Sequence, residues 1–370
     1  MVDLKKYPLA EPDLIDSPAL VIFTDIAKEN IQKAIGAIGD VRRLRPHVKT
    51  NKSVEACRLM MDAGISKFKC ATIAEAEMLV KAGAKDILLA YQPVGPKQVR
   101  WEMLIMDYPN IRFACLVDHI RIAKQLSEKG VASGKPFEVY LDINAQTNRT
   151  GIAPGEAAEE LYRACLALPG LTVIGMHVYD GHLRQVDWHA RKVACDEGFE
   201  PIEKLAEKLR DEGLKVEIIA GGSTTFTIHA QRPGVICSPG TFIYWDKGYS
   251  DGLPEQPYTP AALVFTRIIS LPAPGLICLD LGHKSIASEN PLPNRVTILG
   301  VSGWEPVSQS EEHLVFKVSP NHSYQVGDCF FGIPYHICPT VALYEQAFTV
   351  EDGCPTGVWR TISRDKKITY

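Results

Sequence analysis

Short β-rich runs alternate with helical patterns from residue 19 to about residue 240, and this alternation limits the possible folds more than any other feature of the sequence. It is the signature of parallel β/α units. The eight β-rich runs are Ala19–Thr24, Val41–Val48, Lys67–Ala71, Asp86–Tyr91, Ile111–Val117, Phe137–Asn144, Val173–Tyr179 and Val216–Ala220. Between them lie segments of helical period such as 73–82, which Gly83 is expected to close. The sequence therefore predicts an α/β fold with a closed (β/α)8 barrel.

The pattern changes after about residue 245, where helical periodicity gives way to alternating runs. These runs are Ala262–Leu271, Val296–Leu299, His313–Val318 and Val341–Val350, and they predict a C-terminal antiparallel β domain. A chain of 370 residues exceeds one ordinary core. We therefore expect a barrel domain at 19–244 and a β domain at 245–370, to which residues 1–18 can add a strand.

Composition favours a protein that acts on small molecules. The formal net charge is −4 with both signs interspersed, so neither nucleic acid nor a membrane is an expected partner. No apolar stretch is long enough to cross a bilayer. Ten cysteines are scattered without a Cys-x-x-Cys pair, which predicts reduced thiols and a cytoplasmic location.

Lys49 follows a short predicted strand and precedes a helix that opens near Ser53. Active sites of barrel enzymes lie at the C-terminal ends of the strands. A neutral lysine amine there can form a Schiff base with pyridoxal phosphate (PLP). A solvated cation at the end of a strand is the alternative reading of the same residue.

A second candidate is the run Gly221-Gly222-Ser223-Thr224, directly after the predicted strand Val216–Ala220. Glycines let backbone N–H groups approach a phosphate, and the hydroxyls add further donors. Barrel enzymes often hold phosphate in the loops after strands seven and eight. An ordinary turn is the competing interpretation.

Other polar side chains stand at predicted strand ends. His177 and Tyr179 share one face of their strand, so the Tyr179 ring can lie against a cofactor or can fill the top layer of the barrel. His182, farther along the same loop, can act as a base or only cap the loop. Arg149 can bond a cofactor or a substrate carboxylate, or form a salt bridge with Asp142 or a neighbouring acid.

His336-Ile337-Cys338 is a candidate metal site in the β domain. In an extended backbone, the spacing of two residues points both side chains to one side. Imidazole and thiolate are suitable ligands for zinc, and two protein ligands leave positions open for water and substrate. The same spacing also arises by chance.

Taken together, these motifs resemble the D-threonine aldolase and D-serine dehydratase family, which are metal-activated PLP enzymes with an alanine-racemase-like barrel. The resemblance spans nearly the whole chain. It rests on six motifs in the order of the family: Pro46-His47-x-Lys49-Thr50, Asn148-Arg149-Thr150-Gly151, His177-x-Tyr179-x-Gly181-His182, Gly221-Gly222-Ser223-Thr224, Ser310-Glu311-Glu312-His313 and His336-x-Cys338-x-Thr340.

The resemblance implies PLP on Lys49, its phosphate at Gly221 to Thr224, cofactor contacts from Arg149 and Tyr179, and a divalent metal (Zn, Mn or Mg) on His336 and Cys338. It also implies a D-amino acid substrate and a homodimer with a shared active site. One departure is visible, because the family usually has a glycine before its Asn-Arg-Thr-Gly string where this chain has Ala145-Gln146-Thr147.

Retro-aldol cleavage of D-threonine to glycine and acetaldehyde is the favoured reaction. His182 and His189 are the candidate bases for the hydroxyl proton. Dehydration of D-serine or a related D-3-hydroxy amino acid is the first alternative, and racemisation of an amino acid is the second. A PLP-binding protein without catalytic activity would keep Lys49 and the glycine loop but would not need the metal pair.

Overall fold

The computed structural model describes residues 4–370, and contacts divide the chain into two compact units. The barrel unit contains Ala34–Lys49, Glu55–Gly240 and Asp365–Tyr370; the sheet unit contains residues up to Lys33, Thr50–Val54 and Thr241–Arg364. The chain therefore passes between the units more than once. The division at residue 245 stays a prediction about domains.

The barrel unit is built on a sheet of seven parallel strands in sequential order. They are β2 (Lys67–Cys70), β3 (Asp86–Leu89), β4 (Arg112–Val117), β5 (Phe137–Ile143), β6 (Leu171–Val178), β7 (Glu217–Ala220) and β8 (Ile236–Cys237). Leu44 bridges Cys237 of β8 and His47 bridges Lys69 of β2, which closes the sheet into a barrel. The predicted fold class is thereby confirmed.

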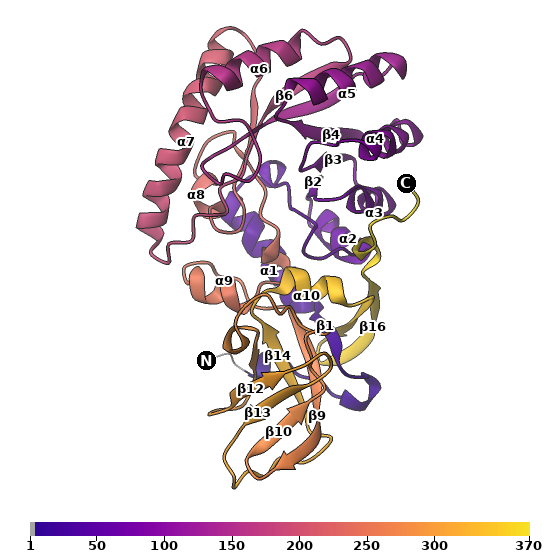
Figure 1. The fold of residues 1–370 in the computed structure, drawn as a ribbon, viewed down its shortest axis with the longest axis vertical. Coiled ribbons are helices and arrows are strands. Elements are labelled where there is room, and N and C mark those ends of the chain that lie inside the picture. The colour runs from indigo at the N-terminus through magenta and orange to yellow at the C-terminus, as the bar shows by residue number, and fades with distance from the viewer. Residues whose placement is uncertain (1–3) are drawn as a thin grey trace. The chain divides into compact units, whose positions relative to one another are not determined.

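Helices cover the outside of this sheet (Figure 1). They are α2 (Val54–Asp62), α3 (Ile73–Ala82), α4 (Pro96–Asp107), α5 (Ile120–Ala132), α6 (Glu156–Leu166), α7 (Trp188–Asp211) and the short α8 (Phe226–His229). α3 ends as predicted, because Gly83 has φ +104° and its N–H donates to the carbonyls of Leu79 and Val80.

Two of the eight predicted barrel strands are wrong. Ala19–Thr24 forms β1 (Ala19–Phe23), but β1 pairs with strands of the sheet unit. All five of its residues are buried, so its composition looks like that of a barrel strand. Val41–Val48 forms a 3-10 turn at Val41–Arg43 and isolated bridges instead of a strand. The two-residue β8, which completes the barrel, was not predicted because so short a run shows no period.

The sheet unit contains a nine-stranded sheet in which β1 and β15 pair in parallel and the other pairs are antiparallel. Its other strands are β9 (Ala262–Ala273), β10 (Leu276–Leu279), β11 (Val296–Ile298), β12 (Glu305–Gln309), β13 (Leu314–Lys317), β14 (Cys329–Pro334), β15 (Gln346–Glu351) and β16 (Cys354–Arg360). One side of the sheet packs an apolar cluster around Val264, Ile277 and Phe316. The predicted C-terminal β domain thus forms as a mixed sheet.

Three further expectations fail in the sheet unit. The predicted run Val341–Val350 divides between the end of helix α10 (Ile337–Leu343) and β15. Another helix, α9 (Lys247–Gly252), follows residue 245. Within 4–18 the structure has only 3-10 turns at Leu4–Lys6 and Pro12–Leu14 rather than a strand, and residues 1–3 lie outside the described part. α1 (Thr24–Ile38) leads from β1 into the barrel unit.

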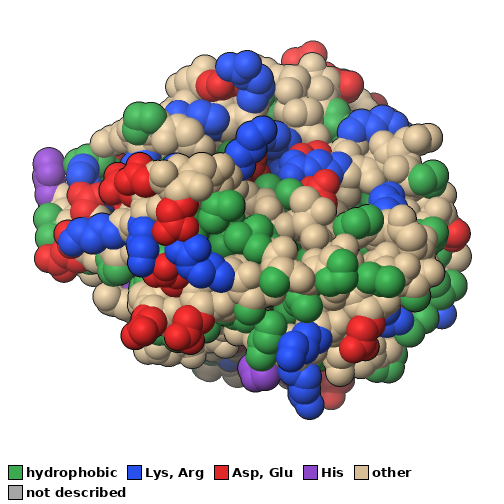
Figure 2. Space-filling model, turned by 90° about the horizontal axis from the view of Figure 1, so that it is seen from above, with side chains coloured by type: hydrophobic (Ala, Val, Ile, Leu, Met, Phe, Trp, Pro, Cys, Tyr) green, Lys and Arg blue, Asp and Glu red, His purple; other side chains and the backbone are tan. Residues whose placement is uncertain are grey.

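Charged side chains of both signs are interspersed on the face shown in Figure 2. Within the barrel unit, Arg163 pairs with Glu159 and with Glu212 at 2.8 Å. No helix among residues 4–370 is long and apolar enough to cross a membrane. All ten cysteines are free thiols.

Candidate active site

Lys49 lies in the turn that follows the segment closing the barrel. Its N–H donates to His47 Nδ1 over 3.3 Å, and its side chain is half-buried. The N–H of Lys69 donates to the Pro46 carbonyl, and the N–H of Val48 donates to the Lys69 carbonyl. The backbone before Lys49 is therefore fixed on β2, and Lys49 stands at the carboxyl end of this barrel segment.

The loop 221–225 follows β7 and is buried throughout. Gly221 has φ +79°, a left-handed conformation that suits glycine. Thr224 is 3% exposed, and its Oγ1 has no hydrogen-bond partner among the described residues. Leaving a buried hydroxyl unpaired is costly, and a phosphate oxygen would satisfy it. The loop therefore fits the phosphate of PLP.

Tyr179 and Arg149 are brought together beside this loop. The Arg149 guanidinium carbon lies 4.4 Å from the centroid of the Tyr179 ring, which is cation–π geometry. A Cβ added to Gly222 would lie 3.0 Å from Tyr179 Cε2, so the ring packs directly on the glycine. The alternative salt bridge between Arg149 and Asp142 is not formed, because Asp142 bonds His177 instead.

A buried chain of polar groups crosses the barrel interior. His177 Nδ1 lies 2.8 Å from Asp142 Oδ1, and Lys69 Nζ lies 3.4 Å from His177 Nε2. Lys69 is only 2% exposed. Burial, followed by the charge of Lys49, lowers the pKa of Lys69 to about 7. Sequence analysis overlooked this lysine, although the alternation Phe68-Lys69-Cys70 placed it on the opposite face of β2 from two apolar residues.

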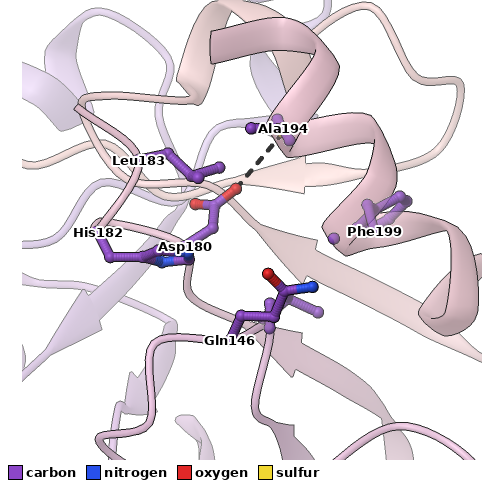
Figure 3. Close-up of a pocket in the computed structure, with 10 residues that line it drawn as sticks. Gln146, Asp180, His182, Leu183, Ala194 and Phe199 are labelled. Carbon is purple, nitrogen blue, oxygen red and sulfur yellow. Dashed lines mark hydrogen bonds between the residues drawn. The ribbon is translucent and has the colours of Figure 1, made fainter. Parts of the chain in front are cut away.

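The two candidate bases lie on exposed positions after β6. His182 is exposed in the loop, and His189 is exposed in the first turn of α7. Figure 3 shows His182 together with Gln146, Asp180 and Phe199 around a cavity of about 10 Å³. A cavity of this size has room for about one water molecule.

Asp180, Cys195 and His229 form a buried cluster that sequence analysis missed. One possible ligand atom from each lies within 4.8 Å of the others, as a metal site would require. A metal needs a thiolate, but burial and then the charge of Asp180 raise the pKa of Cys195 to about 12. The three residues come from different elements and share no sequence motif, so the sequence offered no signal.

The predicted metal pair is brought together within the sheet unit. His336 is the residue just before α10, and interaction with Cys338 contributes to its raised pKa. Burial lowers the pKa of His336, but Cys338, Glu289 and Asp246 together raise it to about 9. The expected extended backbone is wrong, because Cys338 lies in the first turn of α10. Pro339 is tolerated there because N–H groups in a first helical turn have no intrahelical partner.

Further groups complete the surroundings of this pair. Glu289 Oε1 lies 2.5 Å from His336 Nδ1, which leaves His336 Nε2 for a metal. Cys338 Sγ lies 3.1 Å from Thr50 Oγ1 and 3.7 Å from Thr241 Oγ1. An imidazole oriented by a carboxylate, beside a sulfur within hydrogen-bond distance of two hydroxyls, fits a divalent metal such as zinc.

Glu311 and Glu312, unlike His336 and Cys338, are not arranged as metal ligands in the described part of the chain. Both pair with Lys284, at 2.6 and 3.2 Å, and all three side chains are exposed. The two glutamates therefore form an exposed, solvated cluster with Lys284.

Comparison with protein families places two models along the chain. Residues 22–247 match the family described as alanine racemase, N-terminal domain. Residues 261–350 match the putative serine dehydratase domain. The first match covers the barrel with Lys49 and the glycine loop, and the second covers the segment with His336 and Cys338.

Individual proteins resemble nearly the whole chain. A D-threonine aldolase of Arthrobacter sp is 25% identical over 366 residues, covering 96% of this chain and 94% of that protein. A D-threo-3-hydroxyaspartate dehydratase of Delftia sp. (strain HT23) is 29% identical over 250 residues, covering 63% of this chain and 62% of that protein. The crystal structure of D-threonine aldolase from Filomicrobium marinum superposes with a TM-score of 0.88 at 26% identity, covering 97% of this chain and 98% of that one.

Proposed function

Because the chain belongs to the alanine racemase N-terminal domain family, we propose that it is a lyase dependent on PLP and a divalent metal, acting on D-β-hydroxy amino acids. The proposed reaction is retro-aldol cleavage of D-threonine to glycine and acetaldehyde. The observation that carries this proposal is the pair formed by Cys338, which contacts Thr50, the residue after Lys49, and His336, which Glu289 orients. A racemase or a PLP carrier would not need such a pair.

The cofactor-binding role falls to residues of the barrel unit. Lys49 would offer its amine to the aldehyde of PLP, and Thr224 Oγ1 with the N–H groups of the glycine loop would hold the phosphate. Tyr179 and Arg149 would contact the ring and its polar substituents. When bound, PLP supplies an electron sink for a bond broken at Cα.

The metal-binding role falls to His336 and Cys338, with Glu289 holding the imidazole through Nδ1. A bound divalent cation would supply Lewis acidity to the β-oxygen of the substrate. For retro-aldol cleavage a base must take the hydroxyl proton, and His182 and His189 are the candidates. For dehydration, Lys49 would take the proton from Cα instead.

Dehydration is the alternative reaction, supported by the similarity to the Delftia dehydratase and by the thiol at Cys338. Racemisation is a weaker alternative, because it needs a second acid–base group and no metal. Cys338→Ala separates these possibilities. Lost turnover with unchanged PLP binding would support a metal-dependent lyase, whereas full activity would remove the metal from the proposal.

Product analysis tests the reaction directly. The protein is incubated with PLP, a divalent metal and D-threonine, with L-threonine and a chelator as controls. Glycine and acetaldehyde would support the aldolase, and 2-oxobutanoate with ammonia would support the dehydratase. L-allo-threonine, the product of inversion at Cα alone, formed without dependence on metal would point to the racemase. We also propose a cytoplasmic homodimer, which gel filtration with light scattering would test.

A further inference from the structure

A continuous chain of hydrogen bonds leads from the glycine loop to the edge of the barrel unit. Thr225 Oγ1 donates to Asp180 Oδ1 over 2.5 Å, and Asp180 Oδ2 lies 2.8 Å from His229 Nε2. His229 Nδ1 lies 2.9 Å from Arg232 Nη1. Asp180 and His229 are 4% and 0% exposed, so water does not compete for these bonds.

The contact with Arg232 determines which ring nitrogen of His229 carries hydrogen. A guanidinium can only donate hydrogen bonds, so His229 Nδ1 must accept from Arg232. In a neutral imidazole the other nitrogen then carries the hydrogen, and His229 Nε2 donates to Asp180. A nitrogen that carries hydrogen cannot ligate a metal. The cluster of Asp180, Cys195 and His229 is therefore a hydrogen-bond network in this arrangement.

Arg232 is itself fixed from two sides. Its guanidinium lies 4.5 Å from the centroid of the Phe199 ring, and it forms an ion pair with Asp196. The neutral imidazole of His229 thus connects the positively charged Arg232 to the buried carboxylate of Asp180 by two hydrogen bonds. Burial raises the pKa of Asp180, but the contacts with His229 and Thr225 outweigh burial and lower it, so the carboxylate stays ionised.

The network acts on the conformation of the loop. The Thr225 N–H donates to the Gly222 carbonyl and the His229 N–H donates to the Thr225 carbonyl, so Thr225 joins the loop to α8. A Cβ added to Gly221 would lie 3.0 Å from His229 Cδ2. Asp180 uses the hydroxyl of Thr225, whereas the hydroxyl of its neighbour Thr224 is left without a partner.

We propose that Asp180, His229 and Arg232 are positioning residues that hold the 221–225 loop in the conformation that accepts a phosphate. They act from behind the loop through Thr225 and His229. The identity of the phosphate as that of PLP rests on the proposed function. Without the Asp180 carboxylate, the Thr225 hydroxyl loses its hydrogen-bond acceptor. Part of the free energy of phosphate binding is then used to order the loop, so the phosphate binds more weakly.

The test compares PLP with pyridoxal, which has the aldehyde but no phosphate. Dissociation constants of both are measured by visible absorbance for the wild type, Asp180→Asn, Arg232→Gln and Lys204→Gln. We expect Asp180→Asn to weaken PLP binding by about 10- to 100-fold, the effect of losing a charge-assisted hydrogen bond, and to leave pyridoxal binding within about twofold. Arg232→Gln should show a smaller loss of the same kind, and it serves if Asp180→Asn does not fold.

Lys204→Gln is the matched control, because it alters an exposed lysine of α7 that pairs with Glu200 outside the network, and it should bind both compounds as the wild type does. Equal losses for PLP and pyridoxal, or no loss, in Asp180→Asn and Arg232→Gln would overturn the positioning role. So would a metal ion that remains bound in His336→Ala but is lost in His229→Ala. A wild type that does not prefer PLP over pyridoxal would instead contradict the proposed function.

Discussion

Thr50 Oγ1 lies 3.1 Å from Cys338 Sγ. The residue that follows Lys49 in the sequence thus contacts the thiol proposed as a metal ligand. A hydroxyl that donates to sulfur favours its thiolate form, which is the form that binds metal. We expect Thr50→Val to weaken zinc binding by about tenfold, the effect of one hydrogen bond to a charged group, as measured by competition with a chelating dye. Thr50→Ser keeps the hydroxyl and should bind as the wild type; equal losses in both variants would contradict this role.

Glu289 provides a second test of the metal site. Its carboxylate orients His336 through Nδ1, and loss of such a partner typically costs 10- to 100-fold in metal affinity, so we expect about this loss in Glu289→Gln. PLP binding should not change. Glu311→Gln, which alters an exposed carboxylate paired with Lys284, is the control. Unchanged zinc affinity in Glu289→Gln would argue against His336 as a ligand.

Lys49 and Lys69 are both candidates to bind the aldehyde of PLP, and variants of each show which of the two binds it. We expect Lys49→Ala to lose the visible absorbance band of the bound cofactor, because Lys49 carries the amine proposed to form the Schiff base with the aldehyde. Lys69→Met should keep the band, because Lys69 Nζ is buried against His177. Absorbance spectra after incubation with PLP give the answer, and a band that persists in Lys49→Ala would reassign the cofactor to another lysine.

Lys69 also predicts how stability depends on pH. Its pKa falls from 10.5 in the ordinary case to about 7 in the fold, so between these values the unfolded chain binds more protons. The unfolding free energy of the wild type should therefore rise with pH relative to Lys69→Met, by at most about 1.4 kcal/mol per pH unit. The stability advantage of Lys69→Met is then largest below pH 7 and vanishes near pH 10.5.

Urea unfolding at several pH values measures this difference. The charged groups that act on Lys69 are Lys49, Asp142, Arg45 and Arg149, and none of them is altered in Lys69→Met. Lys67→Met on the same strand, where the side chain is only half-buried, should leave the pH dependence unchanged. Parallel curves for the wild type and Lys69→Met would show that Lys69 is not titrating near neutrality.

Gln146 lies in the segment Ala145-Gln146-Thr147, which departs from the pattern of the resembling family, and its φ is +66°. A left-handed conformation costs a side-chain-bearing residue about 1–2 kcal/mol, whereas glycine adopts it freely. We expect Gln146→Gly to raise the unfolding free energy by about 0.5–1 kcal/mol, since the greater freedom of glycine in the unfolded chain offsets part of the gain. Asn148→Gly, at φ +52°, should gain less because asparagine tolerates this region. Destabilisation by Gln146→Gly would show that the side chain supports the Arg149 loop.

Periodicity was enough to predict the fold class, since six of the eight runs form barrel strands close to their expected bounds. Periodicity could not show which sheet β1 joins, because a strand whose residues are all buried has the same apolar composition in either sheet. Lys49 and the glycine loop could be identified as candidate site residues from the sequence, because both follow predicted strands and barrel active sites lie at the C-terminal ends of strands. Glu289 and His229 escaped because their partners, His336 and Asp180, lie 47 and 49 residues away in the sequence. Such contacts depend on the tertiary fold, and no local sequence pattern indicates them.

The place of β1 has a consequence for synthesis on the ribosome. Val21 pairs with Leu263 on one side and with Phe348 on the other, so this strand emerges long before either neighbour exists. Until the barrel has been translated, the apolar segment Ala-Leu-Val-Ile-Phe has no sheet to join, and unpaired apolar strands invite aggregation. Among the strands of this sheet, β1 is thus translated first and is among the last to find its partners, so its apolar side chains stay without their sheet during that interval.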